Sequence, residues 1–339
     1  MINKEQKLAK KIFARNIPTK AIRDGFGEAL VLAGEKNENV VVLTADLKES
    51  TRLHWFAEKF PERFIEVGVA EQALVTIASG MANYGKIPFA TTYAVFSPGR
   101  TWEQIKTTIC LNDVPVKIIG AHAGLGAGPY GATHQSLEDI ALMRTLPNMI
   151  VVAPADAEEA KKATLAIAKN NKPSYLRLAR EETPVFTTEK SPFKIGRAEV
   201  LWCPSTGSGP HGNPEVAIVA CGPLVYEALL AAEALDNKGI ETQVINCHTI
   251  KPIDERTIIR AAKTTGAVVT VEEHQIAGGL GSAVAETLAQ NFPVPMEFIG
   301  VYDSFGESGT PEELQKKHGL KANNIIEAVK RVIARKNIS

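Results

Sequence analysis

An acidic residue stands at the start of an apolar helical segment, directly after a short strand-like run. The run Phe64-Ile-Glu66-Val-Gly68 ends at a glycine, and Glu71 then opens a segment that stays apolar to about Met81. Unpaired N–H groups at a helix start stabilise an ionised carboxylate, whereas apolar neighbours favour its neutral form. Such a group can hold or share a proton, so Glu71 is a candidate acid–base group for a bound heterocycle. An ordinary helix-start glutamate fits this segment too, and the choice between the two interpretations depends on the rest of the chain.

Length, charge and cysteine content limit the class of protein. The 339 residues allow two domains, and 45% hydrophobic with 22% charged residues is typical of a globular chain. Lys+Arg and Asp+Glu are both 38, which argues against general binding to nucleic acid or an anionic membrane. No apolar run approaches the roughly 20 residues of a membrane helix. The scattered cysteines indicate a reduced, cytoplasmic protein: Cys110, Cys203, Cys221 and Cys247.

The N-terminal segment is basic but has no apolar stretch of the kind found in a secretory signal. We expect residues 1–20 to form a short helical arm. Apolar strands then alternate with helices across residues 21–180, which predicts a parallel sheet covered on both faces. The expected strands are 40–44, 87–90, 114–120, 149–153 and 174–178, and the expected helices 24–32, 71–82, 101–111, 137–146 and 156–169.

A second α/β pattern follows a polar segment. Residues 181–194 contain Pro184 and Pro192 and are predicted to be a linker. Residues 195–339 then predict a second domain. Its expected strands are 215–220, 242–246 and 267–271, and its expected helices 224–235, 255–263, 280–291 and 324–335. The stretch 204–214, rich in Gly, Ser and Pro, is predicted to be a surface loop. The predicted fold class is therefore two parallel-sheet α/β domains.

Short motifs along nearly the whole chain occur in an order that resembles the transketolase family. Each motif is weak alone, and their joint order is specific. The resemblance implies a thiamine-diphosphate pyrimidine-binding domain over 21–180 and a transketolase C-terminal domain over 195–339. The motifs are Ala21-Ile-Arg23-Asp-Gly-Phe-Gly-Glu-Ala29, Leu43-Thr-Ala-Asp46-Leu-Lys-Glu-Ser50, the Glu71 segment, Thr91-Thr-Tyr93-Ala-Val-Phe96, Gly120-Ala-His122-Ala-Gly124, Ala132-Thr-His134-Gln135-Ser-Leu-Glu138-Asp139, Thr249-Ile-Lys251-Pro252-Ile-Asp254, Glu272-Glu-His274-Gln-Ile-Ala-Gly-Gly279-Leu-Gly281 and Ser308-Gly309-Thr310-Pro311-Glu312-Glu313-Leu314.

The family's diphosphate site has no counterpart in this sequence. That site uses a Gly-Asp-Gly motif and a downstream Asn to bind the metal, whereas Asp24-Gly25 here follows Arg23. A diphosphate needs a divalent cation with oxygen ligands, and we find no such cluster, so no metal ligand is assigned to this chain. The resemblance implies the C-terminal subunit of a split transketolase. An N-terminal partner subunit would hold the diphosphate and Mg²⁺, in an α2β2 heterotetramer in which this chain also associates with a second copy of itself.

The resemblance also implies which residues contact the cofactor. Glu71 would hydrogen-bond the far ring nitrogen of the aminopyrimidine and so promote the imino form that removes the thiazolium proton. Tyr93 and Phe96 would form an aromatic wall for that ring, although both could be core aromatics at a strand end. Asp46 follows a strand, at the edge where open α/β sheets bind ligands, although a turn-forming aspartate fits there as well.

A sugar phosphate is the substrate that the resemblance implies. The phosphate-binding set would be Arg23, Ser50, Arg180 and His122, because the planar guanidinium suits phosphate. His134 would handle a substrate hydroxyl or developing alkoxide, since histidine titrates near neutrality. As single residues, the arginines also fit solvated surface charges and the histidines structural roles.

One position departs from the family pattern. Many transketolases have an Asp four residues before the second histidine, where it recognises the substrate's α-hydroxyl, and here that residue is Tyr130. A phenol can donate a hydrogen bond but is uncharged and larger. The usual pentose-phosphate donor is therefore not fixed by the resemblance, and a modified or smaller substrate stays open.

Two glycine-rich segments look like ligand loops but are given structural roles. The segment Gly126-Ala-Gly128-Pro-Tyr-Gly131 fits G-x-G-x-x-G but contains a proline. Gly278-Gly-Leu-Gly281 opens a helix and could bind an anion, but it falls in the predicted C-terminal domain. We expect Glu273 and His274 beside it to be interface or loop residues.

The predicted activity is transfer of a two-carbon ketol unit between sugar phosphates, with thiamine diphosphate and Mg²⁺. Three alternatives stay open: a deoxyxylulose-phosphate synthase-like enzyme that uses pyruvate, a 2-oxo-acid dehydrogenase β subunit, and a non-catalytic assembly subunit. The segments around His122 and His134 favour transketolase over the dehydrogenase.

Overall fold

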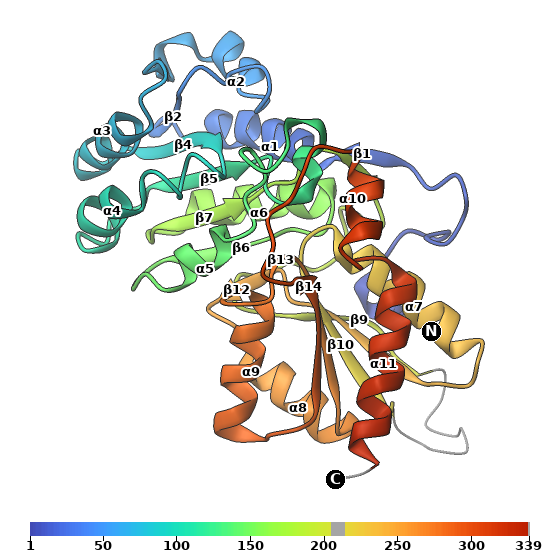
Figure 1. The fold of residues 1–339 in the computed structure, drawn as a ribbon. Coiled ribbons are helices and arrows are strands. Elements are labelled where there is room, and N and C mark those ends of the chain that lie inside the picture. Colours follow the sequence, from blue (N-terminus) through green and yellow to red (C-terminus); the bar gives the residue numbers. More distant parts are fainter. Residues whose placement is uncertain (205–213, 338–339) are drawn as a thin grey trace.

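The computed structural model describes residues 1–204 and 214–337. Its core consists of two sheets, each covered by helices on both faces (Figure 1). This confirms the predicted fold class of two α/β domains. Apart from its first and last residues, the predicted surface loop 204–214 lies outside the described residues.

The first sheet has seven strands in the order β12-β6-β7-β5-β4-β2-β3. All neighbouring strands run parallel except the edge strand β12, which is antiparallel to β6. Parallel strands bring their carboxyl ends to one edge, so residues just after these strands lie near each other. The strands are β2 (Val40–Thr44), β3 (Phe64–Glu66), β4 (Ile87–Tyr93), β5 (Lys117–Ala121), β6 (Ile150–Val152), β7 (Ser174–Arg177) and β12 (Thr249–Lys251).

Strand β2 shows why this sheet is covered on both sides. Its five residues are all buried. Val40 and Val42 pack with the helices of one face, whereas Val41 and Leu43 join the core on the other, because successive side chains point to opposite faces. The first face carries α1 (Ile22–Lys36), α2 (His54–Lys59) and α6 (Ala157–Lys169). The second carries α3 (Glu71–Asn83), α4 (Trp102–Gln104), the π-helical η3 (Ile105–Cys110) and α5 (Asp139–Arg144).

The close approach of α1 and α6 requires a glycine. A Cβ atom at Gly25 would lie 1.9 Å from the backbone oxygen of Ala157, so any larger residue would push the helices apart. This contact fixes the N-terminal turn of α1, which carries Arg23.

The second sheet has five strands in the order β14-β13-β10-β11-β9. Only β9 is antiparallel to its neighbour. Helices α8 (Glu255–Thr265) and α9 (Leu280–Asn291) cover one face, and α7 (Leu224–Asp236) and α11 (Ala322–Lys336) cover the other (Figure 1). Helix α10 (Pro311–Lys317) packs on η4 (Leu125–Tyr130) of the first domain. The strands are β9 (Glu199–Trp202), β10 (Val216–Ala220), β11 (Thr242–Asn246), β13 (Val268–Gln275) and β14 (Met296–Val301).

Strand β12 ties the two domains together. It follows the second-domain strand β11 in sequence but adds to the first sheet, where Thr249 pairs with Val152. The core around it is continuous, since Val151 of the first sheet and Ile245 of the second belong to one apolar cluster. The two domains therefore pack through a shared core as well as through the linker.

Three of the predicted segments have a different structure from the one expected. The N-terminal arm has only a short 3₁₀ turn, η1 (Lys4–Gln6). It lies along the second domain, where Asn3 N–H donates to the Leu201 carbonyl at 2.9 Å, so packing rather than helix propensity orders it. The predicted linker contains β8 (Glu182–Pro184), which pairs with β1 (Thr19–Ala21), because proline is tolerated in an edge strand. The predicted helix 101–111 is α-helical only at its start and π-helical afterwards.

Candidate active site

The residues predicted to act on a ligand lie at the carboxyl edge of the first sheet. Glu71 is the first residue of α3, which follows β3. Tyr93 ends β4, and His122 directly follows β5. Arg23 lies in the first turn of α1, and His134 follows η4. Parallel topology thus gathers residues that are up to 111 positions apart in sequence.

The carboxylate of Glu71 is buried but lies directly beneath an exposed cation. Its side chain is 4% exposed, whereas that of Arg100 is 53% exposed. Arg100 Nη1 donates to Glu71 Oε2 at 2.7 Å. The carboxylate is therefore held at the site and does not point into a sealed core.

Aromatic rings form a continuous row beside this carboxylate. The ring centroids of Tyr93 and Phe96 are 5.9 Å apart with nearly parallel planes. The His134 ring packs edge-on against Phe96 at 5.5 Å, and Tyr130 lies 5.4 Å from His134. The Arg100 guanidinium lies 5.2 Å from the Phe96 centroid. Flat apolar faces thus alternate with groups able to donate hydrogen bonds, as recognition of a flat heterocycle requires.

His122 is buried between an aromatic ring and an arginine. Its ring centroid is 4.0 Å from that of Tyr93, and its Nε2 is 3.3 Å from Arg23 Nη1. A guanidinium can only donate, so Nε2 accepts and the ring proton lies on Nδ1. Among the described residues Nδ1 has no hydrogen-bond partner, which leaves it free to donate to a bound group.

Burial and nearby cations keep this histidine neutral. They lower the pKa of His122 to about 3, with burial the largest cause, followed by Arg23, Arg180 and Arg52. Burial likewise lowers the pKa of Arg23, and Arg52 adds to that effect. The clustered positive charge makes this part of the edge favourable for an anion such as phosphate.

Three predicted site residues take less direct positions. The Asp46 side chain is exposed, and its backbone N–H donates to Glu66 Oε1 at 2.8 Å. Ser50 contacts Arg23 through its carbonyl oxygen at 2.8 Å, whereas its hydroxyl faces Leu47. Arg180 pairs with Glu181 and lies 5.2 Å from the centroid of the Tyr130 ring. These residues border the cluster, and within the described part of the chain no hydrogen bond joins their side chains to Glu71.

Sequence reasoning missed Arg100 and Arg52. Arg100 lies in the turn after β4, and its backbone N–H donates to the Phe96 carbonyl. Arg52 Nε bonds Asp24 at 2.5 Å and has a positive φ of 67°. A signal was present for Arg100, because a basic residue four positions after a predicted stacking aromatic can lie over that ring.

A second group of charged residues lies at the domain interface and is sealed. Asp139 Oδ2 accepts from Arg177 Nε and from the Tyr175 hydroxyl, both at 2.8 Å. Arg177 also donates to the Glu273 carbonyl at 2.9 Å. Glu273 and His274, expected in an interface or loop, are buried near the C-terminal end of strand β13. This sealed cluster joins the domains.

The glycine-rich start of α9 is occupied by a side chain of the chain itself. Glu272 accepts from the backbone N–H groups of Leu280 at 2.7 Å and Gly281 at 2.8 Å. An anion therefore has no free N–H groups at these two positions, which supports a structural role for the loop. The other glycine-rich segment forms the 3₁₀ turn η4 against α10.

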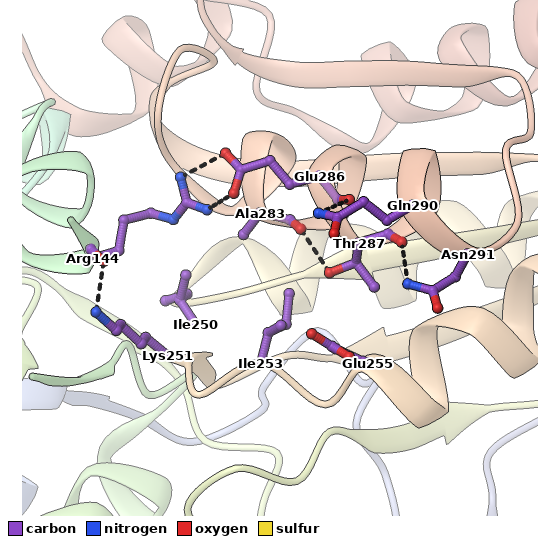
Figure 2. Close-up of a pocket in the computed structure, with 10 residues that line it drawn as sticks. All are labelled: Arg144, Ile250, Lys251, Ile253, Glu255, Ala283, Glu286, Thr287, Gln290 and Asn291. Atoms are coloured by element: carbon purple, nitrogen blue, oxygen red, sulfur yellow. Dashed lines mark hydrogen bonds and ion pairs between the residues drawn. The ribbon is translucent and has the colours of Figure 1, made fainter. Parts of the chain in front are cut away.

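A pocket of about 480 Å³ lies between the domains, apart from this cluster (Figure 2). Arg144 forms two bonds to Glu286 across its rim, at 3.1 and 2.5 Å. Lys251 donates to the Arg144 carbonyl at 3.0 Å. None of the predicted site residues lines it, and its basic side chains are already paired, so it belongs to domain packing.

The described residues 1–204 and 214–337 contain no group of three or more His, Cys, Asp or Glu side chains that could hold a metal ion. None of the helices in this part of the chain is long and apolar enough to cross a membrane.

The two domains match two family models. Residues 19–185 match the transketolase pyrimidine-binding domain, and residues 209–325 match the transketolase C-terminal domain. The chain belongs to the transketolase family. Within that family it corresponds to the C-terminal section, which carries the pyrimidine-binding and C-terminal domains.

Relatives cover nearly the whole chain. A putative transketolase C-terminal section of Methanocaldococcus jannaschii is 42% identical, over 91% of this chain and 95% of that protein. A 6-deoxy-6-sulfo-D-fructose transketolase subunit of Clostridium sp. (strain MSTE9) is 39% identical, over 93% and 95%. A solved split gene transketolase, described as an inactive beta4 tetramer, is 44% identical with a TM-score of 0.85, over 93% of this chain and 99% of that one.

Proposed function

We propose that this chain is the C-terminal subunit of a split transketolase and transfers a two-carbon ketol unit between sugar phosphates with thiamine diphosphate and Mg²⁺. The observation that carries the proposal is the juxtaposition of buried Glu71 with the Phe96 face at a solvent-accessible sheet edge. An acid and a flat apolar face are what the aminopyrimidine of this cofactor requires. When bound, the cofactor supplies the carbon nucleophile.

The chain's own residues then have separate roles. Glu71 holds a proton at the far ring nitrogen of the pyrimidine, and Tyr93 and Phe96 orient the ring. Neutral His122 donates from Nδ1, and Arg23 with Arg180 binds the phosphate of the sugar. His134, which lies against Phe96, exchanges a proton with the substrate oxygen. Asp46 and Ser50 border this site.

A partner subunit has to supply the diphosphate site. Support comes from the lack of a metal-binding group among residues 1–204 and 214–337 and from apolar side chains exposed near Glu71. Val69 is 73% exposed and Ile77 is 41% exposed. Exposed apolar residues beside an incomplete site favour a subunit contact there. The partner is an N-terminal transketolase subunit, and the assembly also contains a second copy of this chain.

The donor sugar is the least constrained part of the proposal. Tyr130 stacks beside His134 and beneath Arg180, so a neutral, bulky group lies where a carboxylate would recognise a hydroxyl. Relatives that include sulfofructose and apulose-4-phosphate transketolase subunits support a modified ketose. A 1-deoxy-D-xylulose-5-phosphate synthase of Thermomicrobium roseum is 38% identical, and this chain spans 47% of it, so pyruvate is the competing donor.

The test is reconstitution. We expect the chain to co-purify with an N-terminal subunit that contains a Gly-Asp-Gly segment. The complex should cleave ketose phosphates when supplied with thiamine diphosphate and Mg²⁺, and the chain alone should not. Robust ketol transfer by the isolated chain would contradict the split-subunit proposal. Faster decarboxylation of pyruvate than cleavage of any ketose phosphate would favour the synthase-like alternative.

A further inference from the structure

Arg100 reaches two groups that the proposed cofactor also needs. Its guanidinium lies 5.2 Å from the Phe96 ring centroid, and its Nη1 donates to Glu71 Oε2 at 2.7 Å. The turn after β4 positions this residue, because the backbone N–H of Arg100 donates to the Phe96 carbonyl at 3.0 Å. The cation therefore spans the space between the aromatic face and the acid.

A guanidinium in this position imitates the pyrimidine ring. It is planar, donates N–H groups to a carboxylate, and stacks on aromatic faces. An aminopyrimidine placed against Phe96 and Glu71 would need the same volume. The two groups are thus alternatives, and the structure shows the arginine in place.

The bond from Arg100 also competes with the proposed role of Glu71. Oε2 of Glu71 already accepts a charge-assisted hydrogen bond from Arg100, so this oxygen is not available to a ring nitrogen. To hold a proton against a ring nitrogen, Glu71 has to be released from this pair.

Exposure decides which of the two partners can move. The Arg100 side chain is 53% exposed and the Glu71 side chain only 4%. The cation can swing into water at small cost, whereas the carboxylate is fixed at the start of α3. We propose that Arg100 is a gate: in the free subunit it fills the pyrimidine subsite, and the cofactor ring displaces it. This inference rests on the proposed function.

A gate of this kind weakens cofactor binding, because only the molecules in which Arg100 has left the subsite can bind the ring. The apparent dissociation constant equals the intrinsic constant divided by that fraction. If the closed state is favoured about tenfold, removing the arginine tightens binding by about tenfold. Removing a residue that holds the cofactor has the opposite effect, because it raises the dissociation constant.

The experiment compares Arg100→Met with wild type in the reconstituted complex. Calorimetric titration with thiamine diphosphate in the presence of Mg²⁺ gives the dissociation constant. We expect a decrease of about tenfold for Arg100→Met. An intermediate decrease is expected for Arg100→Lys, which keeps the charge but lacks the planar fork. The matched control is Lys106→Met, because Lys106 Nζ lies 5.5 Å from the Trp102 ring in the following helix; its constant should equal that of wild type.

Two results would overturn the gate. One is an unchanged or larger dissociation constant for Arg100→Met with the wild-type complex binding normally. The other is a structure of the cofactor-loaded complex in which Arg100 still bonds Glu71. A wild-type complex that binds no thiamine diphosphate would overturn the proposed function and the gate together, so the two failures are distinguishable.

Discussion

Two acid–arginine pairs in this chain have almost the same length but opposite surroundings. The Glu71–Arg100 pair spans 2.7 Å, and the Asp139–Arg177 pair spans 2.8 Å. Arg100 is 53% exposed, whereas Arg177 is 3% exposed. The sealed pair has further partners and joins two domains. The open pair has a buried acid and a cation that can leave, and this combination suits exchange with a ligand.

The comparison shows that bond length alone does not indicate the role of an ion pair. A pair whose cation is exposed contributes little to stability, because water competes for that charge. Breaking a sealed pair leaves a buried charge without compensation, which is costly. Variants of the two pairs should therefore separate activity from stability.

The largest effect should come from Glu71→Gln. In the reconstituted complex we expect turnover to fall at least about 100-fold, as is usual when an acid–base group is removed. The free energy of unfolding of the chain should change by less than about 1 kcal/mol, because Gln keeps the shape of the side chain and the partner that loses its ion pair, Arg100, is exposed. Steady-state kinetics and urea unfolding measure the two quantities. A scaffold subunit would keep its turnover, and that outcome would contradict a catalytic Glu71.

The next largest effect should be on stability, at Arg177. Arg177→Met leaves the Asp139 carboxylate buried without its cation, and we expect a loss of about 3–5 kcal/mol in the free energy of unfolding. Arg100→Met serves as the matched variant. We expect a change below about 1 kcal/mol, because the Glu71 carboxylate lies beneath the exposed guanidinium and gains access to water when that group is removed. Urea unfolding of both variants tests the contrast. Equal losses would mean that the open pair is structural too.

Much of the fold was predictable from local pattern. The five buried residues of β2 and the helix that starts at Glu71 were placed correctly, because burial on both faces and an acidic helix start leave clear signals. Strand β12 was not found, since its pairing with β6 depends on how the domains dock. The prediction of a helical arm was wrong. Residues of the arm such as Ile12 are ordered by contacts with the second domain, and these contacts leave no local pattern in the sequence.

The proximity of several predicted site residues follows from the sequence, whereas their pairings do not. Sheet topology brings Tyr93, His122 and His134 together, as the order of the motifs implies. The bond between Arg100 and Glu71 depends on the path of the turn after β4, which has no periodic pattern in the sequence. The position of the Ser50 hydroxyl is likewise set by a local turn around Leu47.

The smallest effect should be a change in pH dependence at Glu272. Burial raises the pKa of this carboxyl from 4.5 to about 7, despite the bonds from Leu280 and Gly281. As pH rises from about 4.5 to 7, the unfolded chain releases this proton while the folded chain keeps it, so stability falls across that window.

Glu272→Gln lacks this titration. Between pH 5 and 8 its stability should therefore decline less than that of wild type, by up to about 3 kcal/mol. Urea unfolding at several pH values measures the difference. The control is Glu313→Gln, because hydrogen bonds from Thr310 lower the pKa of that exposed carboxyl, so its removal cannot abolish the decline. Equal slopes for wild type and Glu272→Gln would show that the folded chain ionises Glu272 as readily as the unfolded chain does.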